Sequence, residues 1–140
     1  MTSYLPYAHV TKRYQLNGRR IRTSKCQAIA GAQLAGGFAN RMEWTHNFDQ
    51  YQAIARDLFS QGATLYSNMV DSQALAYVAS GRLDGIWHSQ LDNNIDAALL
   101  LAQEAGGLIA DFKGGQPLHN KQLVCANAKL LKYLLKATNK

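Results

Sequence analysis

The fold is decided by residues 75–107, LAYVASGRLDGIWHSQLDNNIDAALLLAQEAGG. Apolar residues at helical spacing predict a helix that ends at Gly81. Asp84-Gly85 then predicts a turn into a short strand over residues 85–88. A helix, a tight turn and a strand in this order form the unit from which an α/β sheet is built.

The second part of this stretch predicts another helix and another strand. After a loop over residues 89–94, Asp96 opens a helix whose apolar run, residues 97–105, should be buried against a sheet. Gly106-Gly107 should end this helix before a strand over residues 108–111. An aspartate in the first turn of a helix complements the helix dipole, and this structural role alone accounts for Asp96.

The amino-terminal half predicts a β-hairpin followed by mixed elements. Residues 7–14 alternate enough to form a strand, Leu16-Asn17-Gly18 is a strong turn signal, and residues 20–23 should form the returning strand. Residues 27–34 are an apolar run typical of a buried strand, which Gly36-Gly37 should break.

The remaining elements alternate between helix and strand. Residues 40–47 are polar and predict a surface loop, and apolar residues at helical spacing predict a helix over residues 48–60. A strand should follow over residues 63–67. After a loop that follows Asp111, we expect a last strand over residues 123–126.

The last predicted helix is amphipathic and begins after Asn127, a favourable capping residue. Leucines form its apolar side, and lysines form an opposite side that we interpret as a solvated face. The two sets are Leu130, Leu131, Leu134 and Leu135, and Lys129, Lys132, Lys136 and Lys140.

Strands that alternate with helices after a hairpin predict a layered α/β sandwich with a mixed or largely parallel sheet. The chain has 140 residues, of which 47% are hydrophobic, and this suits one domain with a substantial core. We therefore expect a single domain over residues 1–140, with the hairpin at residues 4–23 and the core at residues 27–138. Cys26 and Cys125 lack zinc-ligand spacing and are expected to be buried thiols.

Charge and hydropathy limit the classes of partner. No apolar run reaches the roughly 20 residues of a membrane span, and the first residues lack the apolar core of a signal peptide, so we expect a cytoplasmic protein. The formal charge of +6 fits long-range attraction of phosphates. The basic cluster near the hairpin turn has no recognition helix or aromatic platform, so nucleic acid is not expected as a partner. This cluster comprises Arg19, Arg20, Arg22 and Lys25.

Four segments resemble the carboxy-terminal half of the inositol monophosphatase family: AYVASGRLDG, the aspartate that opens the second helix, EAGG and LIADF. LNGRRIRTS also resembles the family's asparagine-glycine turn, so the resemblance covers nearly the whole chain. It implies the matching half of the sugar-phosphatase fold and a magnesium-dependent, lithium-sensitive phosphomonoesterase for a sugar or inositol phosphate. It also implies that Asp96 is a ligand of Mg²⁺, although Ile95 replaces the family's tryptophan.

Two places near the implied substrate depart from the family's pattern. Trp87-His88 stands where the family has an aromatic residue and a glutamate, so His88 is either a substrate contact or a histidine that hydrogen-bonds at a loop edge. Met69, Val70 and Asp71 stand where the family has small residues, which let backbone N–H groups approach a phosphate. Asp71 either brings a negative charge to the substrate or is an ordinary first-turn residue. His88 and Asp71 are therefore the candidate substrate-binding residues.

The family's motif Asp-Pro-hydrophobic-Asp-Gly-Thr occurs nowhere in the sequence. Two-metal phosphoryl transfer needs several carboxylates around two cations about 3.5 to 4 Å apart, so Asp96 alone does not suffice. Two functions therefore remain open. The chain is the carboxy-terminal half of a phosphatase, inactive until an amino-terminal half completes a site for a small phosphorylated substrate, or it is a non-catalytic module of the same fold that self-associates or binds a partner.

We also expect a homodimer. A chain that lacks the other half should expose a sheet edge and apolar surface, and two-fold self-pairing is the commonest way to cover them. The hairpin residues expected at this interface are Tyr4, Leu5, Tyr7 and Val10.

Overall fold

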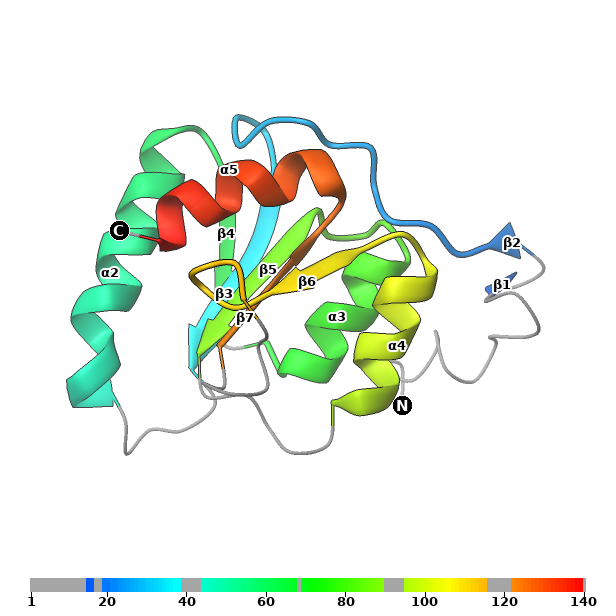
Figure 1. The fold of residues 1–140 in the computed structure, drawn as a ribbon. Helices are drawn as coiled ribbons and strands as arrows, with labels where there is room; N and C mark the ends of the chain where they lie inside the picture. The colour runs from blue at the N-terminus through cyan, green and yellow to red at the C-terminus, as the bar shows by residue number, and fades with distance from the viewer. Residues whose placement is uncertain are drawn as a thin grey trace.

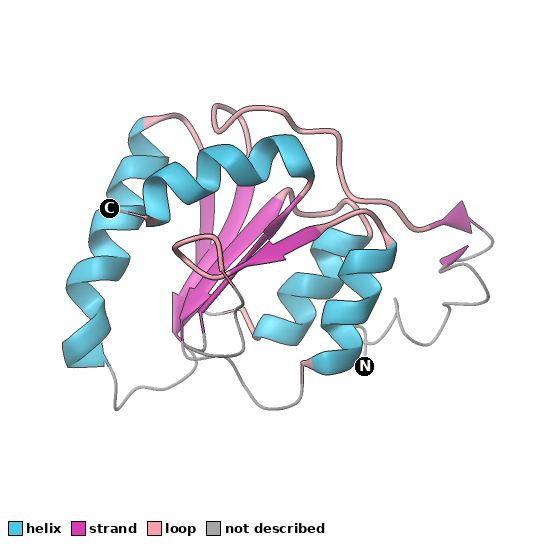
Figure 2. Ribbon diagram, viewed as in Figure 1, coloured by secondary structure: helices cyan, strands magenta, loops and turns pink. Residues whose placement is uncertain are grey.

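A five-stranded sheet lies between two layers of helices in the computed structural model of the protein (Figures 1 and 2). The structure describes residues 15–16, 19–38, 44–67, 69–89, 95–115 and 122–139.

The strands of the sheet are β3 (Gln33–Phe38), β4 (Thr64–Ser67), β5 (Gly85–Ser89), β6 (Leu108–Ala110) and β7 (Gln122–Ala126). Their order across the sheet is β4-β3-β5-β7-β6. Strand β3 runs parallel to β4 and β5, whereas β7 runs antiparallel to β5 and β6. The sheet is mixed, and the predicted layered α/β sandwich is confirmed.

Two helices cover each face of the sheet. Helices α2 (Trp44–Ser60) and α5 (Ala128–Thr138) lie on one face, and α3 (Asp71–Ala79) and α4 (Asp96–Glu104) lie on the other (Figure 1). Asn127 caps α5 as predicted, because its side-chain oxygen accepts a hydrogen bond of 2.9 Å from the Leu130 backbone N–H.

The amino-terminal hairpin is confirmed in part. Strands β1 (Gln15–Leu16) and β2 (Arg19–Arg20) pair antiparallel, as the asparagine-glycine turn predicts. The returning strand ends earlier than expected, and the strand predicted over residues 7–14 lies outside the described residues. The chain then crosses the ends of α3 and α4, where Ile21 is buried and Thr23 N–H donates to the Ala105 carbonyl at 3.0 Å.

The stretch of residues 75–107 folds nearly as predicted. Helix α3, strand β5, helix α4 and strand β6 follow in that order, and Gly81 and Gly106 have φ of +79° and +103° after the two helices. Helix α4 packs against the sheet as predicted, but not all of its apolar residues are buried. Ala98, Leu101 and Ala102 are buried, but Leu100 remains 52% exposed, because only one side of α4 meets the sheet and α3.

The predicted bounds of β3 are wrong. The expected strand over residues 27–34 is mostly loop, and Gly36-Gly37, expected to break it, lies inside β3. The indole ring of Trp87 on β5 explains Gly36, because a Cβ at this position would overlap that ring. Gly36 lets the Trp87 ring approach the β3 backbone closely inside the sheet, and it does not end the strand.

Helix α2 begins earlier than predicted. The expected loop over residues 40–47 was wrong for Trp44–Asn47, which form the first turn of the helix. Apolar periodicity reports the buried side of a helix, so it gave no signal for a mostly polar first turn. The periodic part is correct: Ile54 and Leu58 are buried against the sheet.

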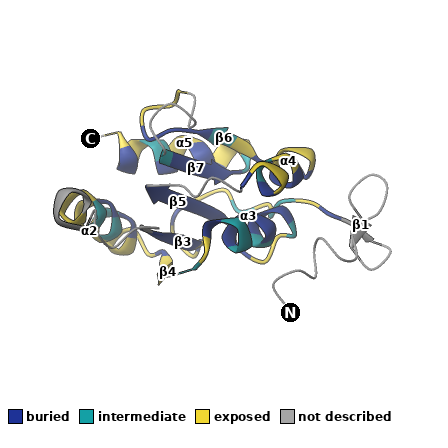
Figure 3. Cartoon of the chain, turned by 90° about the horizontal axis from the view of Figure 1, so that it is seen from below, coloured by how far each residue is buried: buried dark blue, intermediate teal, exposed yellow. Residues whose placement is uncertain are grey.

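The core consists of one apolar cluster on each face of the sheet (Figure 3). Successive residues of a strand contribute to opposite clusters, as the pleat requires. On β5, Ile86 packs towards α3 and α4, and Trp87 packs towards α2 and α5. Cys125 is buried as predicted, and burial raises the pKa of its thiol to about 12, whereas Cys26 is only half-buried.

No helix among the described residues is long and apolar enough to cross a membrane. The single-domain boundaries and the cytoplasmic location remain predictions.

Gly36→Ala should lower the free energy of unfolding by about 1–3 kcal/mol, because the added methyl group overpacks against Trp87. The Trp87 ring has little freedom to move, since it stacks on Tyr51 with 5.0 Å between ring centroids. Urea unfolding followed by circular dichroism measures this loss.

The matched double variant, Gly36→Ala with Trp87→Phe, separates this clash from a general effect of the alanine. A smaller ring leaves room for the methyl group, so the double variant should lose less stability than the sum of the two single variants. Strictly additive losses would show that the two residues do not meet.

Candidate functional site

The three predicted site residues lie near the carboxyl edge of the parallel strands. Helix α3 follows β4 and helix α4 follows β5, so both helices begin at the edge where these strands end (Figure 1). Helices α3 and α4 also pack side by side. Ligands of open α/β sheets bind outside the carboxyl ends of the strands, so this edge is the candidate site.

Asp71 is the first residue of α3, as predicted, and its side chain is 2% exposed. Its Oδ1 accepts a hydrogen bond of 2.7 Å from the Ser72 backbone N–H. The preceding residue, Val70, makes no side-chain cap. The carboxylate therefore already uses one of the helix-start donors with which a bound phosphate would otherwise interact.

His88 lies inside β5 and does not end it. Its partners across the sheet are Gly37 on β3 and Leu123 on β7, and its side chain is 5% exposed. The expectation of a histidine at a loop edge is therefore wrong, because the strand continues to Ser89. By the alternation of the strand His88 lies on the face of Ile86, which is covered by α3 and α4.

Asp96 begins α4, and its side chain is exposed. Ile95, which replaces the tryptophan of the related pattern, is 2% exposed and packs in the cluster beneath α3 and α4. The start of α4 thus keeps a buried apolar anchor followed by an accessible carboxylate. This arrangement presents an oxygen ligand to solvent at the carboxyl edge.

The described residues do not hold a metal ion by themselves. Among them, no group of three or more histidine, cysteine, aspartate or glutamate side chains is close enough to bind one. Mg²⁺ requires octahedral oxygen coordination and keeps its waters when few carboxylates are present. Among the described residues Asp96 therefore offers one accessible carboxylate and not a complete set of ligands.

Two other carboxylates have structural roles, and that of Asp84 is the turn that the sequence predicted. Asp84 forms the turn before β5, and its Oδ2 accepts from the Gln33 N–H at 2.7 Å while its own N–H donates to the Gln33 carbonyl at 2.8 Å. These bonds join β5 to β3 at the edge opposite the site. Glu104 is exposed at the end of α4.

An aromatic stack that the sequence did not predict lies on the opposite face of the sheet. Phe48 stacks on Tyr51, and Tyr51 stacks on Trp87, with centroid separations of 6.5 and 5.0 Å. Burial raises the pKa of Tyr51 above its ordinary value. Trp87 Nε1 is buried and has no hydrogen-bond partner among the described residues. The helical spacing of Phe48 and Tyr51 predicted the helix but not the ring on β5 that they cover.

The chain matches the inositol monophosphatase family over residues 4–140. It is 41% identical over 122 residues to the Nus factor SuhB of Pseudomonas aeruginosa, covering 86% of this chain and 45% of that protein. It is 35% identical over 121 residues to an inositol-1-monophosphatase of Rhizobium meliloti, covering 85% and 45%. The chain thus spans about half the length of these curated relatives, in their carboxy-terminal half.

Solved structures have the same fold. The extragenic suppressor protein suhB of Bartonella henselae superposes with a TM-score of 0.80 at 27% identity, covering 89% of this chain and 48% of that chain. An inositol monophosphatase of Anabaena superposes with a TM-score of 0.76 at 23% identity, covering 86% and 48%. The second likeness shows the fold alone.

Asp96 should bind Mg²⁺ only weakly, with a dissociation constant in the millimolar range or higher, because a single carboxylate displaces few of the waters of the ion. Titration calorimetry of the chain, of Asp96→Asn and of Glu104→Gln measures this binding. Glu104→Gln is the matched control, since it removes an exposed charge from the other end of α4. Micromolar binding that Asp96→Asn abolishes would mean that further carboxylates, such as Asp71 or Asp92, complete a site.

Proposed function

Because the chain belongs to the inositol monophosphatase family, we propose that it is the carboxy-terminal part of a metal-dependent phosphomonoesterase. The reaction is the hydrolysis of a sugar or inositol phosphate. An amino-terminal part completes the site, and the 140-residue chain alone does not turn over substrate. The name of the Rhizobium meliloti relative, an inositol-1-monophosphatase, supports inositol phosphate as the substrate.

The observation that carries this proposal is the exposed Asp96 carboxylate at the head of α4. The backbone of α4 is held by buried Ile95 and by packing against α3, so the core fixes the place of Asp96 at this edge of the sheet. In the complete site Asp96 would supply one oxygen ligand to the Mg²⁺ implied by the family, and the metal would provide Lewis-acid chemistry for phosphoryl transfer. The remaining ligands come from the amino-terminal part.

In this proposal His88 and Asp71 line the substrate-binding part of the site. His88 lies on the sheet face beneath the two helices, where a neutral or charged imidazole contacts a hydroxyl or phosphate oxygen. Asp71, with its carboxylate at the head of α3, favours a hydroxyl over a phosphate at that helix start, because two anions repel there. The phosphate is then bound nearer to Asp96.

A second candidate function is a non-catalytic module of the same fold. The buried carboxylate of Asp71 favours it, since this charge opposes an anionic substrate. The curated name of the Pseudomonas aeruginosa relative, Nus factor SuhB, also describes something other than a phosphatase. In this alternative the fold is kept, and the protein acts by self-association or by binding a partner.

Self-association is part of both candidates. Strands β4 and β6 are the two outer strands of the sheet, and β1 and β2 pair only with each other among the described residues. Strands β1 and β2 lie apart from the five-stranded sheet, at the side of α3 and α4 (Figure 1). We propose that the hairpin region, residues 4–23, contributes to a homodimer interface.

The first test is phosphate release by the purified chain with Mg²⁺ and inositol phosphate. We expect none above a protein-free control, because two-metal chemistry needs several carboxylates. Joining the chain to the amino-terminal half of the Pseudomonas aeruginosa relative should produce lithium-sensitive release. Asp96→Asn should abolish this activity, and Glu104→Gln should leave it unchanged.

Two outcomes would contradict the proposal. Robust, lithium-inhibited release by the 140-residue chain alone would show that it already contains a complete site. A folded joined protein that binds Mg²⁺ but releases no phosphate would favour the non-catalytic module.

The oligomeric state is tested by light scattering with limited proteolysis. We expect twice the monomer mass of 15.5 kDa at micromolar concentration, with residues 4–23 protected from cleavage. A monomer whose hairpin is nevertheless protected would contradict the homodimer proposal, because the hairpin would then be covered by its own chain.

A further inference from the structure

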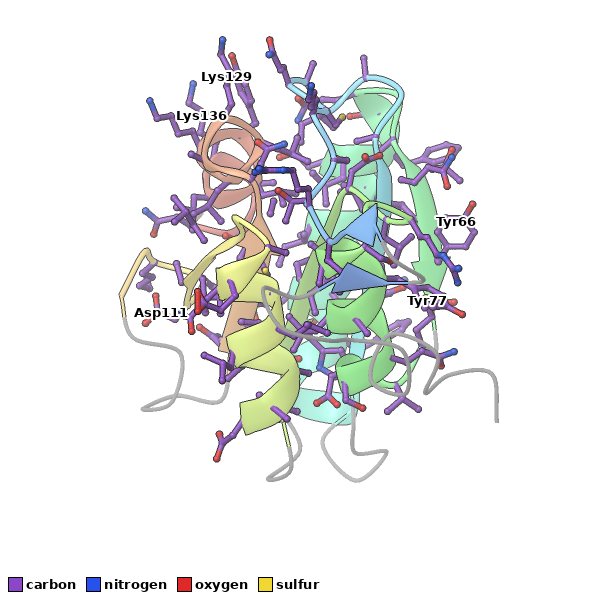
Figure 4. The ribbon with its side chains drawn as sticks, turned by 90° about the vertical axis from the view of Figure 1, so that its right-hand side faces the viewer. Tyr66, Tyr77, Asp111, Lys129 and Lys136 are labelled. Carbon is purple, nitrogen blue, oxygen red and sulfur yellow. The ribbon has the colours of Figure 1, made fainter. Side chains whose placement is uncertain are left out.

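Helix α5 has a continuous basic side. Leu130, Leu131 and Leu134 are buried against the sheet, whereas Lys129, Lys132 and Lys136 are exposed on the opposite side. Figure 4 shows Lys129 and Lys136 pointing outwards from the helix. At 1.5 Å per residue, the three ammonium groups extend over about 10 Å along the helix axis. No residue of α5 is acidic.

The fold extends this basic side at both ends of α5. Asn127 Nδ2 donates to the carbonyls of Ser24 and Cys26, at 2.9 and 2.7 Å, so the exposed Lys25 lies beside the amino end of the helix. Near the carboxyl end, Thr138 Oγ1 donates to the Phe112 carbonyl at 3.0 Å.

This second bond places the exposed Lys113, the neighbour of Phe112, beside the carboxyl end of the helix. Two exposed lysines distant in sequence thus lie near the two ends of the helix.

An aromatic ring lies among these lysines. Tyr133 is 40% exposed, and Lys136 Nζ lies 5.4 Å from the centroid of its ring. Lys136 covers one face of this ring, the rest of the exposed ring surface is where a base would stack, and the adjacent ammonium favours an anion next to it. We call the whole set the α5 cationic surface: Lys25, Lys113, Lys129, Lys132, Tyr133 and Lys136.

We propose that the α5 cationic surface binds the phosphate backbone of single-stranded nucleic acid, with a base stacked on Tyr133. Such binding needs a row of cations and an aromatic platform, and it needs no groove. The expectation that nucleic acid is not a partner came from the Arg-rich hairpin cluster, which has no platform. The structure places a platform on a different element.

The same surface suits other polyanions less well. A membrane-binding helix inserts its apolar side into the lipid, but the leucines of α5 are buried in the core of the protein. An acidic peptide normally adds apolar anchors in a groove, whereas α5 presents a convex row of charges. The surface is also on the opposite face of the sheet from α3 and α4, so it is independent of the candidate phosphatase site.

Fluorescence anisotropy with a labelled single-stranded oligonucleotide of about 15 nucleotides tests the proposal. For three to five lysine contacts, log K should fall with log salt with a slope of about −2 to −3.5. Lys129→Gln with Lys132→Gln should reduce this slope by about 1.4 and weaken binding at low salt about tenfold. Tyr133→Ala should weaken binding of the single strand and leave binding of a duplex unchanged.

The matched control is Arg22→Gln with Arg82→Gln, which removes the same charge from exposed residues beside the carboxyl end of α3. This control should bind as the original chain does, and circular dichroism should show that all variants keep the same thermal midpoint. Equal weakening by the control would mean that net charge alone attracts the oligonucleotide. Tighter binding of poly-glutamate or of anionic vesicles, lost in the same lysine variant, would overturn nucleic acid as the ligand.

Discussion

The contact between the Trp87 ring and the Gly36 backbone is the constraint on which the centre of the sheet depends. It lets the largest side chain of β5 pack closely against β3 and stack on Tyr51 of α2, so one ring joins two strands and a helix. All five residues of β5 are buried, with one neighbour parallel and one antiparallel. The strand that carries this contact therefore also sets the register of both halves of the sheet.

Because side chains alternate between the two faces along β5, the packing of Trp87 also affects the candidate site on the other face. With Trp87 directed towards α2 and α5, His88 is necessarily directed towards α3 and α4. A slip of one residue would exchange the two and would bury a large indole beneath the helices that carry Asp71 and Asp96. The packing of one face of the sheet thus decides which polar side chain the other face presents.

Local signals predicted the elements that depend on neighbours in sequence. The turn at Asp84-Gly85 and the glycine stop at Gly106 are backbone requirements, and both were predicted correctly. Gly36 was interpreted as a break because the residue that needs it, Trp87, is distant in sequence and only the sheet brings them together. The same applies to the site: the sequence named Asp71, His88 and Asp96, but only the topology shows that α3 and α4 begin at one edge.

The position of the lysines also changes the interpretation of the net charge of +6. From sequence alone, this charge fits attraction of a phosphorylated substrate. In the structure, three of the lysines lie on the outer side of α5, separated from α3 and α4 by a helix and a sheet, which is about 20 Å. The Debye length in physiological salt is about 8 Å, so these charges are largely screened at the candidate site. The described charged residues at the starts of α3 and α4 are the carboxylates Asp71 and Asp96, so the α5 lysines do little to attract an anionic substrate there.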